Sequence, residues 1–389
     1  MNTPGRQTLA DIPAAEWDAL VASASPNPAD PNPGLAHAFL LALEESRCAC
    51  PASGWEPRFL TRREAGRLVG ALPLYAKHHS WGEFVFDWAW AEAYRRQGMA
   101  YYPKWIVASP FTPTTGPRLL AATPAIRAEL LDHCLELAKE AGVSSLHLLF
   151  PHEAQAREMA DRGMLLRRGV QFHWRNPGYG SFEDYLADLR RDKRKKVRQE
   201  RRQVFEAGIR FRHLSGGDIG EAEWRHFMAC YGRTHQTYQS PPALNLDFFL
   251  RIGATMPDRL LLVMAYRDGR PIAAAFNLRG PRTLYGRAWG ALEFHPGLHF
   301  ETCYYQAIEH CIEHRIDLFE GGAQGEHKLA RGFLPSTTWS AHWLAEPRFA
   351  KAVEDFLDRE GNGLDDYMDT LSGRSPFRQA GGSEPGTEE

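Results

Sequence analysis

Four side chains that could move protons or hold anions lie close together late in the chain. A strand-like apolar run ends at Glu320, and three glycines loosen the backbone by Gly325. The four side chains follow within about two helical turns, so that they can converge: Glu326, His327, Lys328 and Arg331. Carboxylate and imidazole groups suit general acid–base catalysis, whereas lysine and arginine suit anion binding.

The same stretch has a counterpart earlier in the chain. At an offset of 169 residues, positions 146–174 align with 315–343 without a gap, and nine of the 29 pairs are identical. The identical pairs are Leu149/Leu318, Phe150/Phe319, Ala154/Ala323, Gln155/Gln324, Arg162/Arg331, Gly163/Gly332, Leu165/Leu334, His173/His342 and Trp174/Trp343. This period is far longer than the roughly 20 to 50 residues of repeat arrays, so we infer an internal duplication of one α/β unit.

The two copies differ at the positions that could carry proton-transfer groups. The first has Arg-Glu-Met at 157–159, and the second has Glu-His-Lys at the corresponding positions 326–328. Groups suited to proton transfer are therefore concentrated in the second copy. We expect the active site there, with Glu326 or His327 as the base or the acid.

Composition limits the class of protein. The 389 residues are 43% apolar and 24% charged with a formal charge of -2, which predicts two or three globular domains without a general attraction to nucleic acid or membrane. Six cysteines without C-x-x-C spacing favour a reduced, cytoplasmic setting. No apolar run is long enough for a transmembrane segment, and the Cys/His pairs of 302–314 lack a third ligand, so we expect no metal site.

Strands and helices are expected to alternate. Hairpins at 56–63/67–77 and 260–266/271–278 come before helices at 125–141 and 302–314, each of which is followed by a strand. Strand, helix, strand implies a right-handed crossover and a mixed or parallel sheet, which places the chain in the α/β class. We expect a first domain over 1–175, a second over 176–350, and a C-terminal helix with a disordered tail over 351–389, the tail beginning after Gly373.

An aromatic stretch at 78–102 contains two acids, Glu83 and Asp87. Two interpretations are open. The rings are buried core, because aromatic side chains dominate protein interiors. Alternatively, Glu83 and Asp87 face a pocket lined by indoles and hold an amine or a ring-bearing acceptor.

A basic run at 190–202 holds nine basic residues and two acids. With Ser181 as an N-cap and an apolar stripe, it predicts a helix or helix pair with a cationic outer face. That face is either a solvated surface or a site for a phosphate-bearing ligand, which Lys193, Arg194 and Arg198 would contact. A second anion position is the start of the helix at 302–314, next to His299.

The order hairpin, strand, loop, helix, strand, glycine-rich turn and helix resembles the GNAT superfamily of N-acyltransferases. Two such units, the second opened by basic sequence, resemble the Fem-type peptidyltransferases and in particular the bacterial Fem-like predicted N-acyltransferases of peptidoglycan biosynthesis or recognition. The stretches that carry the resemblance are 80–90, 193–202 and 322–333, the last of which reads Gly-Ala-Gln-Gly-Glu-His-Lys-Leu-Ala-Arg-Gly-Phe. The resemblance extends from about Leu35 to Phe356.

The resemblance implies two tandem GNAT-like domains that transfer an acyl group to an amine without a covalent enzyme intermediate. GNAT enzymes place a tyrosine acid where this chain has Glu326, His327 and Lys328, and Lys328 and Arg331 would hold donor or acceptor anions. We expect acyl-CoA as the co-substrate and no permanently bound cofactor; aminoacyl-tRNA is the alternative donor, because the GNAT pyrophosphate loop is missing before Thr302. The acceptor would be a small, nucleotide-linked or lipid-linked amine. A rival hypothesis is a non-catalytic module that binds phosphorylated precursors or RNA.

Overall fold

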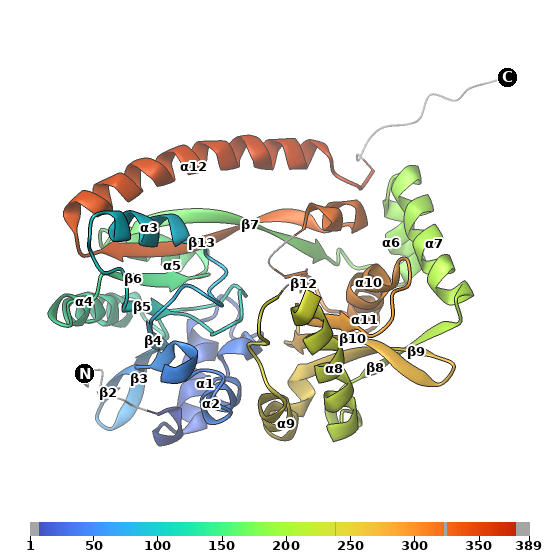
Figure 1. Cartoon of the computed structure of the whole chain (residues 1–389), viewed down its shortest axis with the longest axis horizontal. Coiled ribbons are helices and arrows are strands. Elements are labelled where there is room, and N and C mark those ends of the chain that lie inside the picture. The colour runs from blue at the N-terminus through green and yellow to red at the C-terminus, as the bar shows by residue number, and fades with distance from the viewer. Residues whose placement is uncertain (1–7, 238, 323–324, 379–389) are drawn as a thin grey trace.

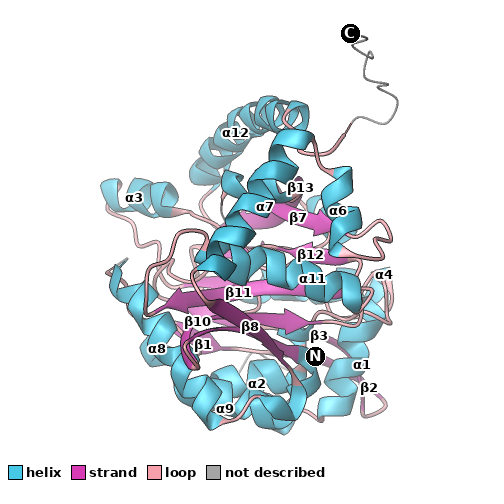
Figure 2. Ribbon diagram, turned by 90° about the vertical axis from the view of Figure 1, so that its right-hand side faces the viewer, coloured by secondary structure: helices cyan, strands magenta, loops and turns pink. Residues whose placement is uncertain are grey.

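The computed structural model describes residues 8–237, 239–322 and 325–378. Ala323 and Gln324 of the repeat lie outside the described residues, as do positions 379–389 of the expected tail. Within the described ranges one mixed sheet has eleven strands in the order β1-β4-β5-β6-β13-β7-β12-β11-β10-β9-β8, with helices on both of its faces (Figure 2). No helix in these ranges combines the length and the apolar character needed to span a bilayer.

The first half is built from short helices and strands on the left of Figure 1. Its elements are η1 (Leu9–Asp11), α1 (Ala14–Ala24), η2 (Pro33–Leu35), α2 (His37–Glu45), η3 (Pro51–Ser53), β1 (Trp55–Pro57), β2 (Leu60–Glu64), β3 (Arg67–Leu72), β4 (Leu74–Lys77), α3 (Trp88–Arg96), β5 (Lys104–Val107), α4 (Pro124–Glu140), β6 (Ser145–Leu149), α5 (Glu153–Ala160) and β7 (Leu165–Arg175). The expected helix at 125–141 is α4, and the expected strand after it is β6.

The second half follows the same plan. Its elements are α6 (Phe182–Asp188), α7 (Arg191–Glu206), β8 (Ile209–Leu214), η4 (Gly216–Asp218), α8 (Glu221–Thr237), α9 (Leu246–Thr255), η5 (Pro257–Arg259), β9 (Leu260–Arg267), β10 (Arg270–Arg279), β11 (Thr283–Ala291), α10 (Leu298–Phe300), the π-helical η6 (Glu301–Tyr305), α11 (Gln306–Glu313), β12 (Leu318–Glu320), the 3-10 helix η7 (Glu326–Arg331), β13 (Leu334–Leu344) and α12 (Pro347–Gly373). The hairpin expected around 267–270 is β9–β10.

The basic run forms the helix pair that its pattern predicts. The Ser181 side chain accepts the Asp184 N–H at 3.1 Å and so caps α6. On α7, Val197 and Val204 are buried, and Glu200 and Arg201 also face the protein, where they pair with Arg331 and Glu301. The cationic helix is therefore docked by one apolar stripe.

The last strand of each half pairs with the sheet of the other half. β13 lies between β6 and β7, and β7 lies between β13 and β12, so that both long strands cross the middle of the molecule beneath α12 (Figure 1). Gly169 lies opposite Thr338, which is its own counterpart at the offset of 169. This local two-fold relation supports the duplication, while the domain boundaries at 175 and 350 stay predictions.

The C-terminal segment departs from the expectation. The helix begins at Pro347, and residues beyond Gly373 still pack on the protein, because Phe377 forms a β-bridge with Leu189 next to α6. The backbone N–H of Arg190 also donates to the Pro376 carbonyl at 2.9 Å. The polar composition of this segment did not reveal that its backbone hydrogen-bonds to residues 188–190.

Candidate active site

The second half contains a place where two parallel strands separate. β11 and β12 pair over only three positions, ending at Tyr285–Glu320. β12 then stops, whereas β11 continues to Ala291 with a bulge at Arg287. A bulge leaves its extra residue unpaired in the ladder. The strands thus separate directly after Glu320, where the glycines that follow β12 begin.

Glycines carry the chain from β12 into η7. Gly322 and Gly325 have φ angles of +86° and +112°, which side chains with a Cβ rarely adopt. The element that follows is a 3-10 helix, in which positions three apart share a face. Lys328 and Arg331 accordingly both point inward, whereas the two residues that open η7 stay exposed. The four predicted side chains therefore do not all converge.

His327 is joined to Tyr304, a residue that the sequence reasoning did not identify. The His327 Nε2 lies 3.1 Å from the Tyr304 hydroxyl, which belongs to the π-helical turn η6. Such turns occur frequently at functional sites. Partial burial, and then the charges of Lys328 and Arg331, lower the pKa of His327, so its ring is neutral at pH 7 and can accept the hydroxyl proton. The pair combines a base with a hydroxyl that can pass a proton.

His299 stands beside this pair. Its ring centroid lies 5.9 Å from that of His327 and 4.5 Å from that of Trp289. Burial lowers the pKa of His299 to about 4, with the neighbouring His327 acting in the same direction. The ring is uncharged at neutral pH and forms part of an aromatic wall, while substrate binding by His299 stays a prediction.

Lys328 is buried at the end of β12. It is 3% exposed, and its Nζ donates to the Gly322 carbonyl at 3.0 Å. Burial lowers the pKa of Lys328 to about 8. Its counterpart in the first half is Met159, which is fully buried among apolar neighbours. Burying an amine at a position that a methionine fills in the first half costs the free energy of desolvating the amine. This cost indicates a function for Lys328.

Arg331 is committed to contacts within the protein. Its Nη2 lies 2.7 Å from the Glu200 carboxylate, and its Nη1 donates to the His327 carbonyl at 2.6 Å. Its guanidinium carbon lies 3.4 Å from the centroid of the Phe300 ring. Glu200, on α7, also accepts the hydroxyl of Tyr305. We therefore favour a positioning role for Arg331 over the predicted contact with a substrate anion.

Glu326 lies on the other side of η7. Its carboxylate accepts the Tyr367 hydroxyl at 2.7 Å and pairs with Arg374 at 3.2 Å, both from the C-terminal segment. These hydrogen bonds lower the pKa of Glu326, the one from Tyr367 most. The structure brings Glu326 to α12 and brings His327 to Tyr304, so the geometry favours His327 as the proton-transfer group.

Glu83 and Asp87 bind an amine that belongs to the protein itself. The Lys104 Nζ donates to Glu83 at 2.8 Å and to Asp87, and the Tyr101 hydroxyl donates to Asp87 at 2.6 Å. Both carboxylates are buried in the first half, and burial raises the pKa of Glu83 to about 7. Substrate contacts from these two residues stay a prediction that needs Lys104 to move.

The basic helix α7 lies next to η7, which it contacts through the Glu200–Arg331 ion pair. The three residues predicted to bind phosphate lie on this helix. Lys193 pairs with Asp192 at 2.9 Å, and Arg198 pairs with Glu183 at 2.5 Å. The Arg194 Nη1 reaches a backbone carbonyl of α6 at 3.5 Å. Pairs between exposed groups contribute little, so these side chains can exchange their partners for a ligand phosphate.

Glu320 is a further titratable group that the sequence reasoning did not single out. It is 5% exposed, and its Oε2 accepts the backbone N–H of Thr115 at 3.3 Å across the junction of the halves. Burial raises the pKa of Glu320 to about 8. The sequence could have revealed Glu320, because an acidic residue at the end of an apolar strand and before two glycines is unusual. Nothing in the sequence of residues 301–305 marked Tyr304 as a functional residue.

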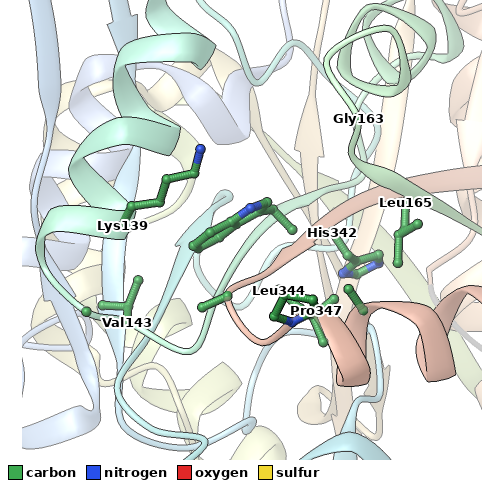
Figure 3. Close-up of a pocket in the computed structure, with 11 residues that line it drawn as sticks. Lys139, Val143, Gly163, Leu165, His342, Leu344 and Pro347 are labelled. Carbon is green, nitrogen blue, oxygen red and sulfur yellow. The ribbon is translucent and has the colours of Figure 1, made fainter.

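A cavity of about 560 Å³ lies between the end of α4 and the start of α12 and is lined by residues of both halves (Figure 3). Val143, Leu344 and Pro347 line it with apolar surface. Its histidine, His342, is already bonded through both ring nitrogens, to His147 and to Ser340. Neither ring nitrogen of His342 is therefore free to transfer a proton to a ligand in this cavity.

Comparisons with known proteins identify a family and a fold. The chain matches the FemAB-like family, described as peptidoglycan biosynthesis/recognition, over residues 8–379. No curated protein matches it. Among solved structures, FemX is 12% identical with a TM-score of 0.57, covering 88% of this chain and 98% of that chain.

Two further structures are similar. L-PGS from Bacillus licheniformis is 9% identical with a TM-score of 0.51, covering 84% of this chain and 98% of that chain. A tandem GNAT protein from the clavulanic acid biosynthesis pathway is 15% identical with a TM-score of 0.47, covering 88% and 98%. At these identities the likeness concerns the fold alone, and the expected α/β fold with a mixed sheet is confirmed.

The buried carboxyl of Glu320 predicts a pH-dependent stability. Its pKa is about 8 in the folded protein and near 4.5 in the unfolded chain, so between these values the unfolded state binds fewer protons and stability falls as pH rises. Glu320→Gln removes this loss. We expect the stability of the variant relative to the wild-type protein to increase from about pH 5 to about pH 8 in urea unfolding.

Glu326→Gln is the matched control with the opposite sign. The pKa of Glu326 is lowered in the folded protein, so its ionised form stabilises the fold above its unfolded pKa. This variant should be less stable than the wild-type protein by a constant amount from about pH 5 to about pH 8, and the difference should shrink only as the pH falls below the unfolded pKa of the carboxyl. A constant difference between Glu320→Gln and the wild-type protein would contradict the burial of an acidic Glu320.

Proposed function

We propose that this chain, which belongs to the FemAB-like family, is a transferase that moves an acyl or aminoacyl group from an activated donor to an amine of a peptidoglycan precursor. The observation that carries the proposal is the neutral His327 bonded to the Tyr304 hydroxyl at the end of β12. Acyl transfer to nitrogen needs a group that removes a proton from an ammonium and later returns one to the leaving group. This pair can do both.

The proton path follows from the hydrogen bond between the two side chains. As the acceptor ammonium gives its proton to the Tyr304 oxygen, the tyrosine gives its own proton to His327, which becomes an imidazolium. The free amine attacks the donor carbonyl and forms a tetrahedral oxyanion. When this intermediate collapses, its nitrogen, which still carries one proton too many for an amide, gives that proton to water. The C–S or C–O bond breaks, and the proton on His327 passes to the leaving thiolate or ribose oxygen.

Lys328 supplies positive charge beside this path. With a pKa of about 8 it is largely protonated at pH 7, and its Nζ has a single backbone acceptor among the bonds of the described residues. A buried cation stabilises a developing oxyanion more than an exposed one, because the surrounding dielectric is low. We propose this role for Lys328.

Glu320 is a second candidate base. Its carboxyl faces the first half through Thr115, so it could take a proton from an amine that is bound at the junction of the two units. With a pKa of about 8 this carboxyl is mostly protonated at pH 7, so only its ionised fraction acts as a base, and that fraction is a stronger proton acceptor than an ordinary carboxylate. In this arrangement the donor would enter from the second half and the acceptor from the first.

The phosphates of the donor would lie on α7. Both acyl-CoA and aminoacyl-tRNA carry phosphates that suit Lys193, Arg194 and Arg198, and neither would be a permanently bound cofactor. Mass spectrometry of ligands retained on the purified protein distinguishes the two donors. A cytoplasmic setting, where both donors are available, remains part of the proposal.

Removal of the proton-transfer pair should abolish turnover. We expect His327→Ala and Tyr304→Phe each to lower kcat by about 100-fold or more, since general acid–base catalysis contributes roughly 10²–10⁴. The assay incubates the protein with acetyl-CoA or aminoacyl-tRNA and a muropeptide amine, and detects the product by mass spectrometry. His78→Ala, at a half-exposed histidine of the first half, should keep wild-type activity. Full activity in both site variants would refute the proposal, and a protein that only binds these ligands would be the non-catalytic module.

Anion binding on α7 should depend on salt. For tRNA, each of Lys193→Gln and Arg198→Gln should reduce the slope of log K against log salt by about 1, because each removes one phosphate contact. Arg225→Gln on α8, whose arginine pairs with Glu221, is the matched control and should leave the slope unchanged. Binding that does not respond to salt would support the solvated-surface interpretation instead.

A further inference from the structure

In the loop before α3 the acidic side chains are buried and the aromatic side chains are exposed, which is the reverse of the usual arrangement. Glu83 and Asp87 are 4% and 3% exposed. The aromatic side chains between and beside them are among the most exposed large apolar groups of the described residues: Trp81 at 65%, Phe84 at 39%, Phe86 at 55% and Trp88 at 41%. Burying carboxylates and exposing indole rings are both unfavourable. A folded protein that does both in one loop has a use for the exposed surface.

The loop is held rigidly in this arrangement. The buried Lys104 Nζ bonds Glu83, Asp87 and the Ser80 hydroxyl, and the Lys77 Nζ donates to the Trp81 carbonyl at 3.1 Å. Phe84 has a φ of +61°, a left-handed conformation that costs about 1 kcal/mol for a residue with a Cβ. The buried ions therefore anchor the backbone while the rings are turned outward.

The outer face of α3 continues the same surface. Trp90 and Tyr94 turn inward, so positions 88, 92, 95 and 96 share the opposite face. That face carries Trp88, Glu92, Arg95 and Arg96, and the two arginines are largely exposed around a single glutamate. Figure 2 shows α3 projecting from the body of the protein. We call residues 81–88 with this face of α3 the aromatic ridge.

The shape and chemistry of the aromatic ridge limit what can cover it. The rings of Trp81 and Trp88 lie 5.2 Å apart at 66°, so they do not form the flat platform on which a sugar ring stacks. Small ligands are held in concave sites, and the cavity of about 320 Å³ beside α3 is lined by Glu92, Arg96 and Phe349 and by none of the exposed rings of the ridge. Tryptophan and phenylalanine beside arginine are the composition of protein surfaces that enter the interfacial layer of a membrane with anionic lipids.

We propose that the aromatic ridge docks the protein on an anionic lipid bilayer, with Trp81, Phe86 and Trp88 in the interfacial layer and Arg95 and Arg96 at the headgroups. This proposal does not rest on the transferase activity, because bilayer binding requires no substrate. If the proposed function also holds, docking would bring the enzyme to lipid-linked acceptors.

Vesicle binding tests the proposal with the full chain. We expect the wild-type protein to sediment with vesicles of phosphatidylglycerol and phosphatidylethanolamine, and about ten-fold less with phosphatidylcholine alone. Trp81→Ser with Trp88→Ser should weaken binding about ten-fold or more, as loss of two buried indoles implies. Phe294→Ser is the matched control, since Phe294 is 90% exposed on another loop, and it should bind like the wild-type protein.

A second pair of substitutions tests whether the two tryptophan rings enter the bilayer. Trp81→Phe with Trp88→Phe keeps aromatic side chains, so it should bind vesicles but lose the quenching of tryptophan fluorescence by brominated lipid that the wild-type protein shows. Unchanged unfolding midpoints would exclude misfolding as the cause of weak binding. The proposal is overturned if the wild-type protein does not bind vesicles, if the serine pair binds equally well, or if Phe294→Ser weakens binding as much.

Discussion

The ion pair between Glu200 and Arg331 is the constraint on which the candidate site depends. The Arg331 side chain is 3% exposed, and a buried guanidinium is tolerated only with a partner that compensates its desolvation. Glu200 provides this partner and also accepts the hydroxyl of Tyr305. Arg331 in turn holds the His327 backbone, while Tyr305 is the neighbour of Tyr304 in η6. One carboxylate on the basic helix thus fixes both members of the proton-transfer pair.

The corresponding strand ends of the first half are built differently. In the first unit the ends of β5 and β6 are covered by the chain itself, because the fully buried Arg118 donates to the carbonyls of Leu149, Thr114 and Pro117. Burial lowers the pKa of Arg118 to about 9. In the second half the strand β12 is followed instead by Gly321 and Gly322, and η7 begins after Gly325.

The sequence was sufficient for the architecture because periodicity and capping are local. The α4 helix, the α8 helix, the Ser181 cap and the β9–β10 hairpin all follow from neighbouring residues. The sequence could not predict that β13 inserts between β6 and β7, so that the last strand of each half pairs with the other half. Nothing in the sequence of either strand names its partner. The candidate site was predicted in part. Lys328 and His327 lie where the charge pattern indicated, but a 3-10 rather than an α-helical turn sends Glu326 toward α12.

The most direct test of the account is a double-mutant cycle on turnover with Glu200→Gln and His327→Ala. If Glu200 acts by positioning the Tyr304–His327 pair, Glu200→Gln lowers kcat in the wild-type protein but changes it little once His327 is absent. Glu206→Gln, at an exposed glutamate on the same helix, serves as the control in both backgrounds. Strictly additive losses would mean that Glu200 and His327 act independently, and would contradict a catalytic pair held in place by α7.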